Sequence, residues 1–306
     1  PPPATYTMAQ TLSLHDALPI LDYTPVVLST LLIDTEKEAI ELFVDPGKIS
    51  PDIYAELGND IVFLEPAELE NKLEDISAVA QYSGKPVLLD HQRSSIWFKN
   101  VLENAGANVR DFKDPCIDPR ARKNDIEKAA IREAHITDGV AMVRFLHWLD
   151  SVGPQSGESE ISVAQKLEDF RQKGQGYRGP SFATISGFAD NGAVVHYHAT
   201  PAKHKQIDKD GLLLVDSGGQ YNNGTTDITR TVAIGEPREE MKESFTQVLR
   251  GHIALARAKF PEGTTGAQLD ALARQFLRSA NKDYDHGTGH GVGCYLSVHE
   301  EASGIS

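Results

Sequence analysis

Hydrophobic positions in the first third of the chain follow two alternating patterns. Short apolar runs predict strands at 28–33, 41–44, 60–64 and 86–90. Apolar residues at helical spacing predict helices at 50–57, 66–81 and 94–105. This alternation indicates an α/β domain. Because it contains no glycine-rich phosphate loop, a structural or oligomerising role is favoured.

The first 20 residues show neither strand alternation nor a sustained helical period. The part from Thr11 to Ile20 resembles the translated read-through of a sequencing adapter, which would make residues 1–20 an artefactual leader. A natural disordered tail is the alternative. A second break, at 114–124, is rich in proline and charge and indicates a linker, so we expect domains at 21–120 and 121–306.

Beyond the linker, long helices and strands follow each other in blocks. A helix is predicted over 125–150, with one apolar face made of Ile126, Ala130, Ile136, Val140, Val143 and Leu149. A second helix is predicted to begin at Ser162, with Gln165 at capping-box spacing. Its inward residues are Val163, Leu167 and Phe170.

The remaining pattern repeats the same order of elements. Strands are predicted at 181–186, 193–197, 212–217 and 225–234. Helices are then predicted to begin at Pro237 and Thr265, the latter with Gln268 at capping-box spacing, and strand material returns over 284–299. Two rounds of helices followed by strands suggest a duplicated α+β unit.

Composition removes several classes of function. The 306 residues include 30 Lys+Arg and 44 Asp+Glu, a formal net charge of −14, which argues against nucleic acid or an anionic membrane as partner. Two cysteines, Cys116 and Cys294, provide neither a disulfide framework nor a thiolate zinc cluster. No apolar run reaches the roughly 18 residues that a membrane span requires. We therefore expect a cytoplasmic enzyme.

Two aspartates bracket a predicted hairpin. The apolar strand that begins at Leu212 ends at Asp216, and Asn222-Asn223-Gly224 is a hairpin turn signal. Folding about that turn would place Asp227 close to opposite Asp216, roughly 5 Å away. Carboxylates that close share a proton or bind a cation. The alternative is that Asp216 caps a turn and Asp227 pairs with Arg230.

Three histidines lie among glycines near the end of the chain. His286-Gly-Thr-Gly-His290-Gly-Val-Gly293 cannot be a helical zinc motif, because alternate glycines disrupt a helix. Glycines instead suggest a backbone that a ligand approaches closely, and His299 follows within fourteen residues of His286. His196 is weaker, since it or His198 could simply line a strand.

These motifs resemble a known family. DSGGQYNNGTTDITRT (216–231), HGTGHGVG (286–293) and LSVHE (296–300), with NGAVVHYHA (191–199) upstream, are similar to aminopeptidase P, a Xaa-Pro aminopeptidase of the pita-bread metallopeptidases. The resemblance runs from about Ala121 to the end, and residues 26–120 resemble the family's middle domain. It implies a creatinase/prolidase-like α/β domain followed by an α+β pita-bread domain that is incomplete at its C-terminus.

The resemblance implies a centre with two divalent cations, usually Mn²⁺. Asp216, Asp227 and His290 would be metal ligands, together with two glutamates that the family places beyond the end of this chain. Glu301-Ala302 departs from the family, which usually has Gly-Pro there. With three of five ligands, we expect the 306-residue chain to bind manganese weakly and to be an inactive fragment.

The same resemblance implies the reaction. A metal-bridged hydroxide would attack the carbonyl before proline, His286 and His299 would line the substrate pocket, and His196 would assist proton transfer or hold the oxyanion. The substrates would be peptides with proline at the second position, and the family often dimerises, so a homodimer is expected. Two alternatives stay open, a prolidase that cleaves Xaa-Pro dipeptides and a non-catalytic pita-bread module that binds peptides.

Overall fold

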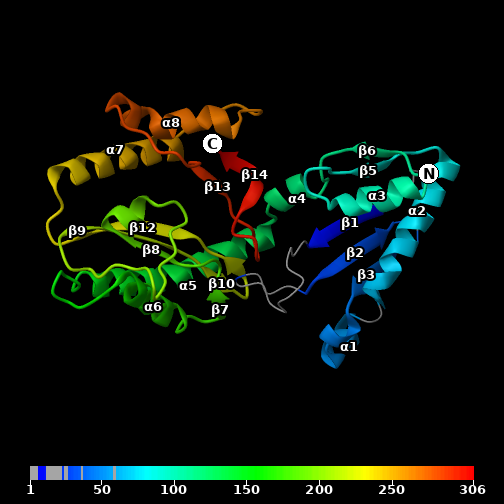
Figure 1. Cartoon of the computed structure of the whole chain (residues 1–306), viewed down its shortest axis with the longest axis horizontal. Helices are drawn as coiled ribbons and strands as arrows, with labels where there is room; N and C mark the ends of the chain where they lie inside the picture. The colour runs from blue at the N-terminus through cyan, green and yellow to red at the C-terminus, as the bar shows by residue number, and fades with distance from the viewer. Residues whose placement is uncertain (1–5, 12–22, 24–26, 36, 58–59) are drawn as a thin grey trace. The chain divides into compact units, whose positions relative to one another are not determined.

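The computed structural model describes residues 6–11, 23, 27–35, 37–57 and 60–306, with the backbone alone for 6–11 and 301–303. The chain divides into two compact units, Pro1–Ile117 and Asp118–Ser306. Figure 1 shows the order of their elements. The first unit alternates strands with helices, and the second combines helices with antiparallel strands, which confirms the expected α/β and α+β classes.

A four-stranded sheet organises the first unit. Its strands, in order across the sheet, are β1 (Tyr6–Thr11), β2 (Ser29–Asp34), β3 (Ala39–Val44) and β4 (Ile61–Leu64). The first three are antiparallel to their neighbours, and β4 is parallel to β3. A separate parallel pair is formed by β5 (Val87–Leu89) and β6 (Val109–Asp111).

Helices of the first unit pack on these strands through one apolar cluster. The helical segments are η1 (Pro46–Lys48), α1 (Pro51–Leu57), η2 (Pro66–Glu68), α2 (Leu69–Ser83) and α3 (Ile96–Asn104). Phe43 of β3, Leu73 of α2 and Leu102 of α3 are buried in that cluster. The four strands and three helices predicted between 28 and 105 are confirmed.

Strands β1 and β6 and the short helix α4 were not predicted. Strand β1 lies within the expected leader, because its backbone pairs with β2 from Tyr6↔Asp34 to Thr11↔Ser29, and such pairing requires no hydrophobic alternation. The rest of that leader, 1–5 and 12–20, lies outside the described residues. Strand β6 was also missed, and a short helix, α4 (Ile117–Ala121), forms within the expected linker.

The second unit combines helices with three small sheets. Its helices are α5 (Asp125–Leu149), α6 (Glu160–Arg171), η3 (Ala189–Ala193), α7 (Glu239–Ala256) and α8 (Gly266–Ser279). The strands are β7 (Tyr177–Pro180), β8 (Ile185–Phe188), β9 (Gly211–Ser217), β10 (Gly219–Tyr221), β11 (Gly224–Thr225), β12 (Ile228–Ile234), β13 (Gly289–Gly291) and β14 (Glu300–Ile305). The sheet orders are β12-β9-β8, β11-β10-β7 and β13-β14.

Helix starts follow the capping chemistry of the sequence. The predicted Thr265–Gln268 capping box is confirmed at the start of α8. The prediction for α6 was wrong by one turn, because Ser159 caps the helix and Ser162 completes the box. The earlier cap makes Glu160 the first residue of α6.

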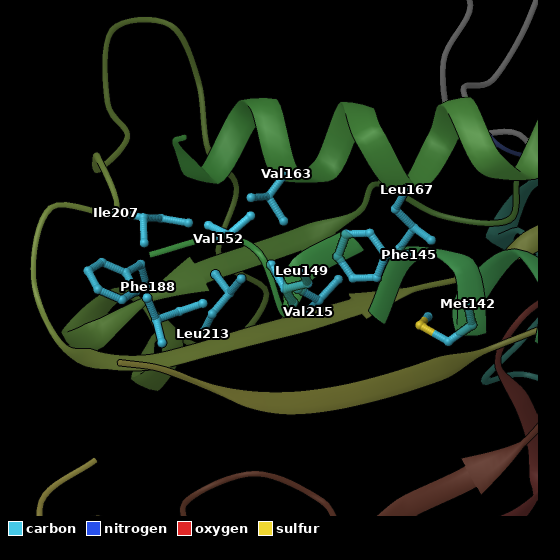
Figure 2. Packing of buried hydrophobic residues seen from close by; sticks show 11 residues of the cluster. Met142, Phe145, Leu149, Val152, Val163, Leu167, Phe188, Ile207, Leu213 and Val215 are labelled. Atoms are coloured by element: carbon cyan, nitrogen blue, oxygen red, sulfur yellow. The ribbon is translucent and has the colours of Figure 1, made fainter. Parts of the chain in front are cut away.

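The core of the second unit lies between the helices α5 and α6 and the sheet β12-β9-β8. Figure 2 shows Val163 and Leu167 of α6 facing Leu213 of β9, with Phe145 of α5 beside them. The predicted inward positions Val163 and Leu167 are confirmed, and Phe170 packs partly buried against the same cluster. Among the described residues, no helix combines the length and apolarity needed to cross a membrane.

The buried face of α5 differs from the predicted one. Of the predicted positions Leu149 is buried, whereas Ile126 is 82% exposed and Val143 is 67% exposed. The buried stripe instead contains Ala134, Asp138, Ala141, Met142, Phe145 and Leu149. Apart from the adjacent pair Ala141 and Met142, its members are three to four residues apart, which fits one helical face better than the predicted set with its six-residue gaps. Asp138 obscured that stripe because it is polar.

Two predicted strands are replaced by irregular backbone. Ala193 ends η3, and a bend and turn follow over 194–196, in which His196 adopts a positive φ of 54°. Within 284–299 the strand content is limited to β13, and β14 begins only at Glu300. Of the predicted strand at 181–186, only the last two residues are strand, as the start of β8, and β7 ends before it. The strand predictions at 212–217 and 225–234 are confirmed as β9 and as β11 with β12.

Candidate metal centre

Asp216 lies on the open face of strand β9. Burial alternates along this strand, so Leu213, Val215 and Ser217 face the core and Asp216 faces away from it. Thr229 of β12 is its register partner and donates a hydrogen bond from Oγ1 to Asp216 Oδ1 over 2.7 Å. The Thr229 hydrogen bond therefore uses one oxygen of a carboxylate that faces away from the core.

Asp227 reaches the same face from the next strand. It precedes β12 by one residue and Thr229, the register partner of Asp216, by two. Asp227 therefore lies diagonal to Asp216, near the position close to opposite that the hairpin pattern predicted. Burial and the negative charge of Asp216 raise the pKa of Asp227 above its usual value, and His290 and His135 oppose that shift. The two carboxylates therefore repel each other in a half-buried position.

The turn between the two aspartates forms as predicted. Asn222 and Asn223 form a two-residue connection between Tyr221 and Gly224, which are register partners. Gly218 permits the strands to approach closely, since a Cβ there would lie 1.9 Å from the Thr226 carbonyl oxygen. The short hairpin therefore requires glycine at position 218.

A buried ion pair is hydrogen-bonded to residues on both sides of the Asn222-Asn223 turn. Asp138 of α5 pairs with Arg171 of α6, with 2.6 Å from Arg171 Nε to Asp138 Oδ1, and both side chains are inaccessible. Asp138 also accepts hydrogen bonds from the Tyr221 hydroxyl at 2.8 Å and the Thr226 hydroxyl at 2.9 Å. Thr226 precedes Asp227, so this network fixes the backbone on which one expected metal ligand is mounted.

His290 and His299 complete a cluster around the aspartates. His290 lies in β13, and its Nε2 is 3.4 Å from Asp227 Oδ2, while its Nδ1 is 2.9 Å from the Gly291 carbonyl oxygen. The His290 and His299 rings meet edge to face with centroids 4.2 Å apart. Ligands of one cation with bonds of about 2.1 Å lie about 3 Å apart, so the His290–Asp227 separation is compatible with a shared ion.

The pKa of His299 is shifted by its surroundings. Burial lowers its pKa, positive charge on His290 and His196 acts in the same direction, and Asp216 opposes the shift. His299 is therefore neutral near pH 7. Its neighbour Glu300 is buried and pairs with Lys123 and Arg120, which anchors the segment at its C-terminal side.

The His286 ring contacts other residues than the aspartates, His290 and His299. The ring stacks on Tyr284 with centroids 4.7 Å apart, and its Nδ1 lies 2.8 Å from the Gly287 carbonyl oxygen. Arg274 of α8 donates to the carbonyl oxygens of Tyr284 and His286, and it pairs with Asp270. These contacts fix the backbone of the glycine-rich segment, while the His286 ring lies against Tyr284 rather than against the aspartates.

The six expected site residues therefore fall into three groups. Asp216, Asp227, His290 and His299 gather together, His196 is near enough to act electrostatically on His299, and His286 is held to one side. Within the described part of the chain, no three His, Cys, Asp or Glu side chains converge as a complete metal-binding group. Asp227 instead lies next to Asp216 and next to His290, so the three expected ligands are neighbours.

Supporting residues were missed by the pattern analysis. Thr229, Asp138 and Glu160 contact the aspartates or the segments that carry the site residues. Asp138 carried a usable signal, since a lone acid within an apolar helical stripe requires a buried partner. Thr229 could have been found from strand alternation, because it is two residues from Asp227 and shares its face.

Solved structures of metallopeptidases resemble this chain. The X-prolyl aminopeptidase of Caenorhabditis elegans, described as a cytosolic enzyme with a di-nuclear active site, superposes with a TM-score of 0.83 and 33% identity, covering 93% of this chain and 46% of the nematode chain. The prolidase of Pyrococcus furiosus superposes with a TM-score of 0.68 and 24% identity, covering 91% of this chain and 76% of the prolidase. The second likeness is one of fold alone.

Curated relatives carry a consistent name. The probable Xaa-Pro aminopeptidase P of Aspergillus fumigatus is 40% identical over 292 residues, which are 93% of this chain and 44% of the fungal protein. The protein of the same name from Aspergillus niger is 39% identical over 295 residues, 93% of this chain and 47% of that protein. The chain thus spans less than half the length of these relatives.

Family models cover both units. A model described as Creatinase/Prolidase N-terminal domain matches residues 21–127, and one described as Metallopeptidase family M24 matches residues 129–306. The expected pita-bread and creatinase/prolidase folds and the resemblance to aminopeptidase P are confirmed. With its paired aspartates and neighbouring histidines on the matched segment, the chain belongs to metallopeptidase family M24.

Proposed function

We propose that the protein containing this chain is a metallo-aminopeptidase that hydrolyses the peptide bond between an N-terminal residue and a following proline. The observation that carries this proposal is the Asp216–Asp227 pair with His290 Nε2 3.4 Å from Asp227, in a chain 40% identical to a protein named as a probable Xaa-Pro aminopeptidase P. Peptides with proline at the second position would be its substrates.

Asp216, Asp227 and His290 would hold divalent cations. These side chains suit a cation, because its positive charge would offset the repulsion by Asp216 and the burial that together raise the pKa of Asp227. Carboxylates with one imidazole suit manganese-like ions, and we propose two Mn²⁺ ions, in line with the di-nuclear site described for the nematode enzyme. When bound, such ions supply Lewis acidity and a nucleophilic water at neutral pH.

The histidines would handle the oxyanion and the leaving group. His299, neutral because burial lowers its pKa, would donate an N–H hydrogen bond to the carbonyl oxygen as that oxygen gains negative charge. His196 would deliver a proton to the prolyl nitrogen, which must be protonated to leave as an amine. His286 would line the pocket for the peptide.

A substrate comparison tests the proposal. The full-length protein, loaded with manganese, is expected to hydrolyse Xaa-Pro-Yaa peptides and to lose that activity in Asp216→Asn. Asp208→Asn, which changes an exposed carboxylate on the segment before β9, is the matched control and should leave the activity intact. Hydrolysis of Xaa-Pro dipeptides alone would instead identify a prolidase. Peptide binding without hydrolysis would identify a non-catalytic module.

The relationship to these metallopeptidases also supports proposals about domain boundaries, cellular location and oligomeric state. We propose that residues 21–120 form the middle α/β domain and 121–306 the M24 domain, with the protein acting as a cytoplasmic homodimer. The cytoplasmic location is supported by the description of the nematode enzyme as cytosolic. Sedimentation of the full-length protein at twice the monomer mass would support the dimer, and a monomer mass would contradict it.

A further inference from the structure

Glu160 is a buried carboxylate that contacts both ends of one surface segment. Its side chain is fully buried at the start of α6. Oε1 accepts from the Phe188 backbone N–H at 2.7 Å and from Asn191 Nδ2 at 2.9 Å. Oε2 accepts from the Tyr197 hydroxyl at 2.8 Å and from the Lys205 backbone N–H at 2.7 Å. Four donors therefore occupy the roughly four acceptor positions of one carboxylate.

Such a carboxylate is stable only with its full set of donors. A buried charge without hydrogen bonds would be strongly unfavourable, and bonds to an ionised acceptor are stronger than those between neutral groups. The N-terminus of α6 also favours a negative charge at this place. The donors belong to residues 188, 191, 197 and 205. The carboxylate therefore holds the loop 188–205 at both of its ends and at two positions between them.

The loop presents His196 in a strained conformation. His196 has a φ of 54° and an exposed side chain, whereas the next residue, Tyr197, is 4% exposed. A residue other than glycine keeps a positive φ only where its surroundings dictate it. His196 and Tyr197 share a peptide unit, so the hydrogen bond from the Tyr197 hydroxyl to Glu160 restricts the backbone conformations open to His196.

We propose that Glu160 is a positioning residue that acts through Tyr197 to fix the conformation of His196. This inference rests on the proposed function, since that function gives His196 its role in proton transfer. Glu160 itself lies behind the loop and need not contact the substrate.

The test removes one hydroxyl from the network. Tyr197→Phe in the full-length, manganese-loaded protein should lower kcat about 10-fold or more and leave KM within about 2-fold, because misdirecting a general acid affects the transition state more than binding. The matched control is Tyr177→Phe, since the Tyr177 hydroxyl donates to Glu168 on the same helix at 2.6 Å. That variant should lose stability but keep kcat.

A double-mutant cycle separates positioning from general destabilisation. If Tyr197 acts through His196, the combined His196→Asn and Tyr197→Phe variant should have the same kcat as His196→Asn alone. Additive losses, or equal losses of kcat in the Tyr197 and Tyr177 variants, would overturn the proposal. Should Tyr197→Phe fail to fold, Asn191→Ala removes a different donor to Glu160 and should give the same pattern.

A measurement without substrate distinguishes the two proposals. Backbone amides between 189 and 205 should exchange hydrogen at least about 10-fold faster in full-length Tyr197→Phe than in the wild type, and should be unchanged in Tyr177→Phe. If the wild type does not hydrolyse Xaa-Pro peptides, the proposed function fails while this result still tests the anchor. Unchanged exchange in Tyr197→Phe would refute the anchor itself.

Discussion

At the scale of single residues, buried tyrosine hydroxyls bonded to carboxylates recur in the second unit. Tyr197 donates to Glu160, Tyr221 donates to Asp138, and Tyr177 makes the same kind of bond to a third carboxylate. Burial and the adjacent negative charge raise the pKa of all three, that of Tyr197 to about 12. Each hydroxyl therefore keeps its proton in the folded protein at a pH where an unfolded tyrosine loses it.

This difference predicts alkaline sensitivity. Below pH about 10 both states are protonated, and between about 10 and 12 only the unfolded state releases protons, so the free energy of unfolding should fall as pH rises. Tyr197→Phe should reduce the steepness of that fall, measured by urea denaturation from pH 8 to 11.5. Tyr82→Phe, at a side chain 96% exposed, should not. Identical slopes in all three proteins would contradict this account.

The Asp138–Arg171 pair supplies a second residue-scale prediction. Asp138→Ala should lower the free energy of unfolding by about 3–5 kcal/mol, because it leaves the Arg171 guanidinium buried without its partner. The control is Asp125→Ala on the same helix, whose carboxylate pairs with Lys128 in full contact with water and should contribute nothing measurable. Chemical denaturation that gives equal effects for both substitutions would exclude a special role for the buried pair.

At the scale of elements, α5 shows which face of a long helix is buried. The stripe that includes Phe145 and Leu149 packs against α6 and the sheet β12-β9-β8, whereas Ile126, Ile136 and Val143 remain exposed. Both faces carry apolar side chains, so apolarity alone cannot select between them. The choice depends on the sheet, whose inner face is presented by Leu213 of β9.

Paired alanine substitutions test this assignment. Phe145→Ala should lower the free energy of unfolding by about 3–5 kcal/mol, since Phe145 is inaccessible and its removal leaves a cavity. Val143→Ala, two residues away on the other face, should stay within about 0.5 kcal/mol. Thermal or urea denaturation of the second unit provides the measurement, and a larger effect at Val143 would restore the face predicted from the apolar pattern.

The elements that sequence patterns predicted are those with local causes. Strand β9, the Asn222-Asn223 turn and the capped start of α8 each depend on neighbouring residues, and each forms as predicted. The segment around His196 does not, because its turn is imposed by Glu160, 36 positions earlier. Periodicity cannot reveal a hydrogen bond between residues so far apart.

At the scale of the whole molecule, the candidate centre is assembled from distant segments. Asp216 comes from β9, Asp227 from the residue before β12, His290 from β13 and His299 from the approach to β14. Residue types and spacing predicted these side chains as site residues, and the structure brings them near one another. Their mutual geometry could not be read from the sequence, because it depends on how three small sheets come together.

Cation binding should therefore stabilise the full-length protein as a whole. Manganese at about 100 times its Kd should add about 2.7 kcal/mol to the free energy of unfolding, seen as a higher melting temperature that depends on manganese concentration. Asp227→Asn should abolish this shift, and Asp208→Asn should keep it. Equal shifts in the two variants would contradict this account.

Gly218 offers a way to recognise related sequences that have lost this centre. A methyl group there would lie 1.9 Å from the Thr226 carbonyl oxygen and 2.2 Å from Ser181 Oγ, so any side chain would push the two aspartate-bearing strands apart. A homologue can retain both aspartates and still lack the spacing for a shared ion. We therefore expect a homologue with any other residue at this position to have lost the centre, even where every expected ligand is present.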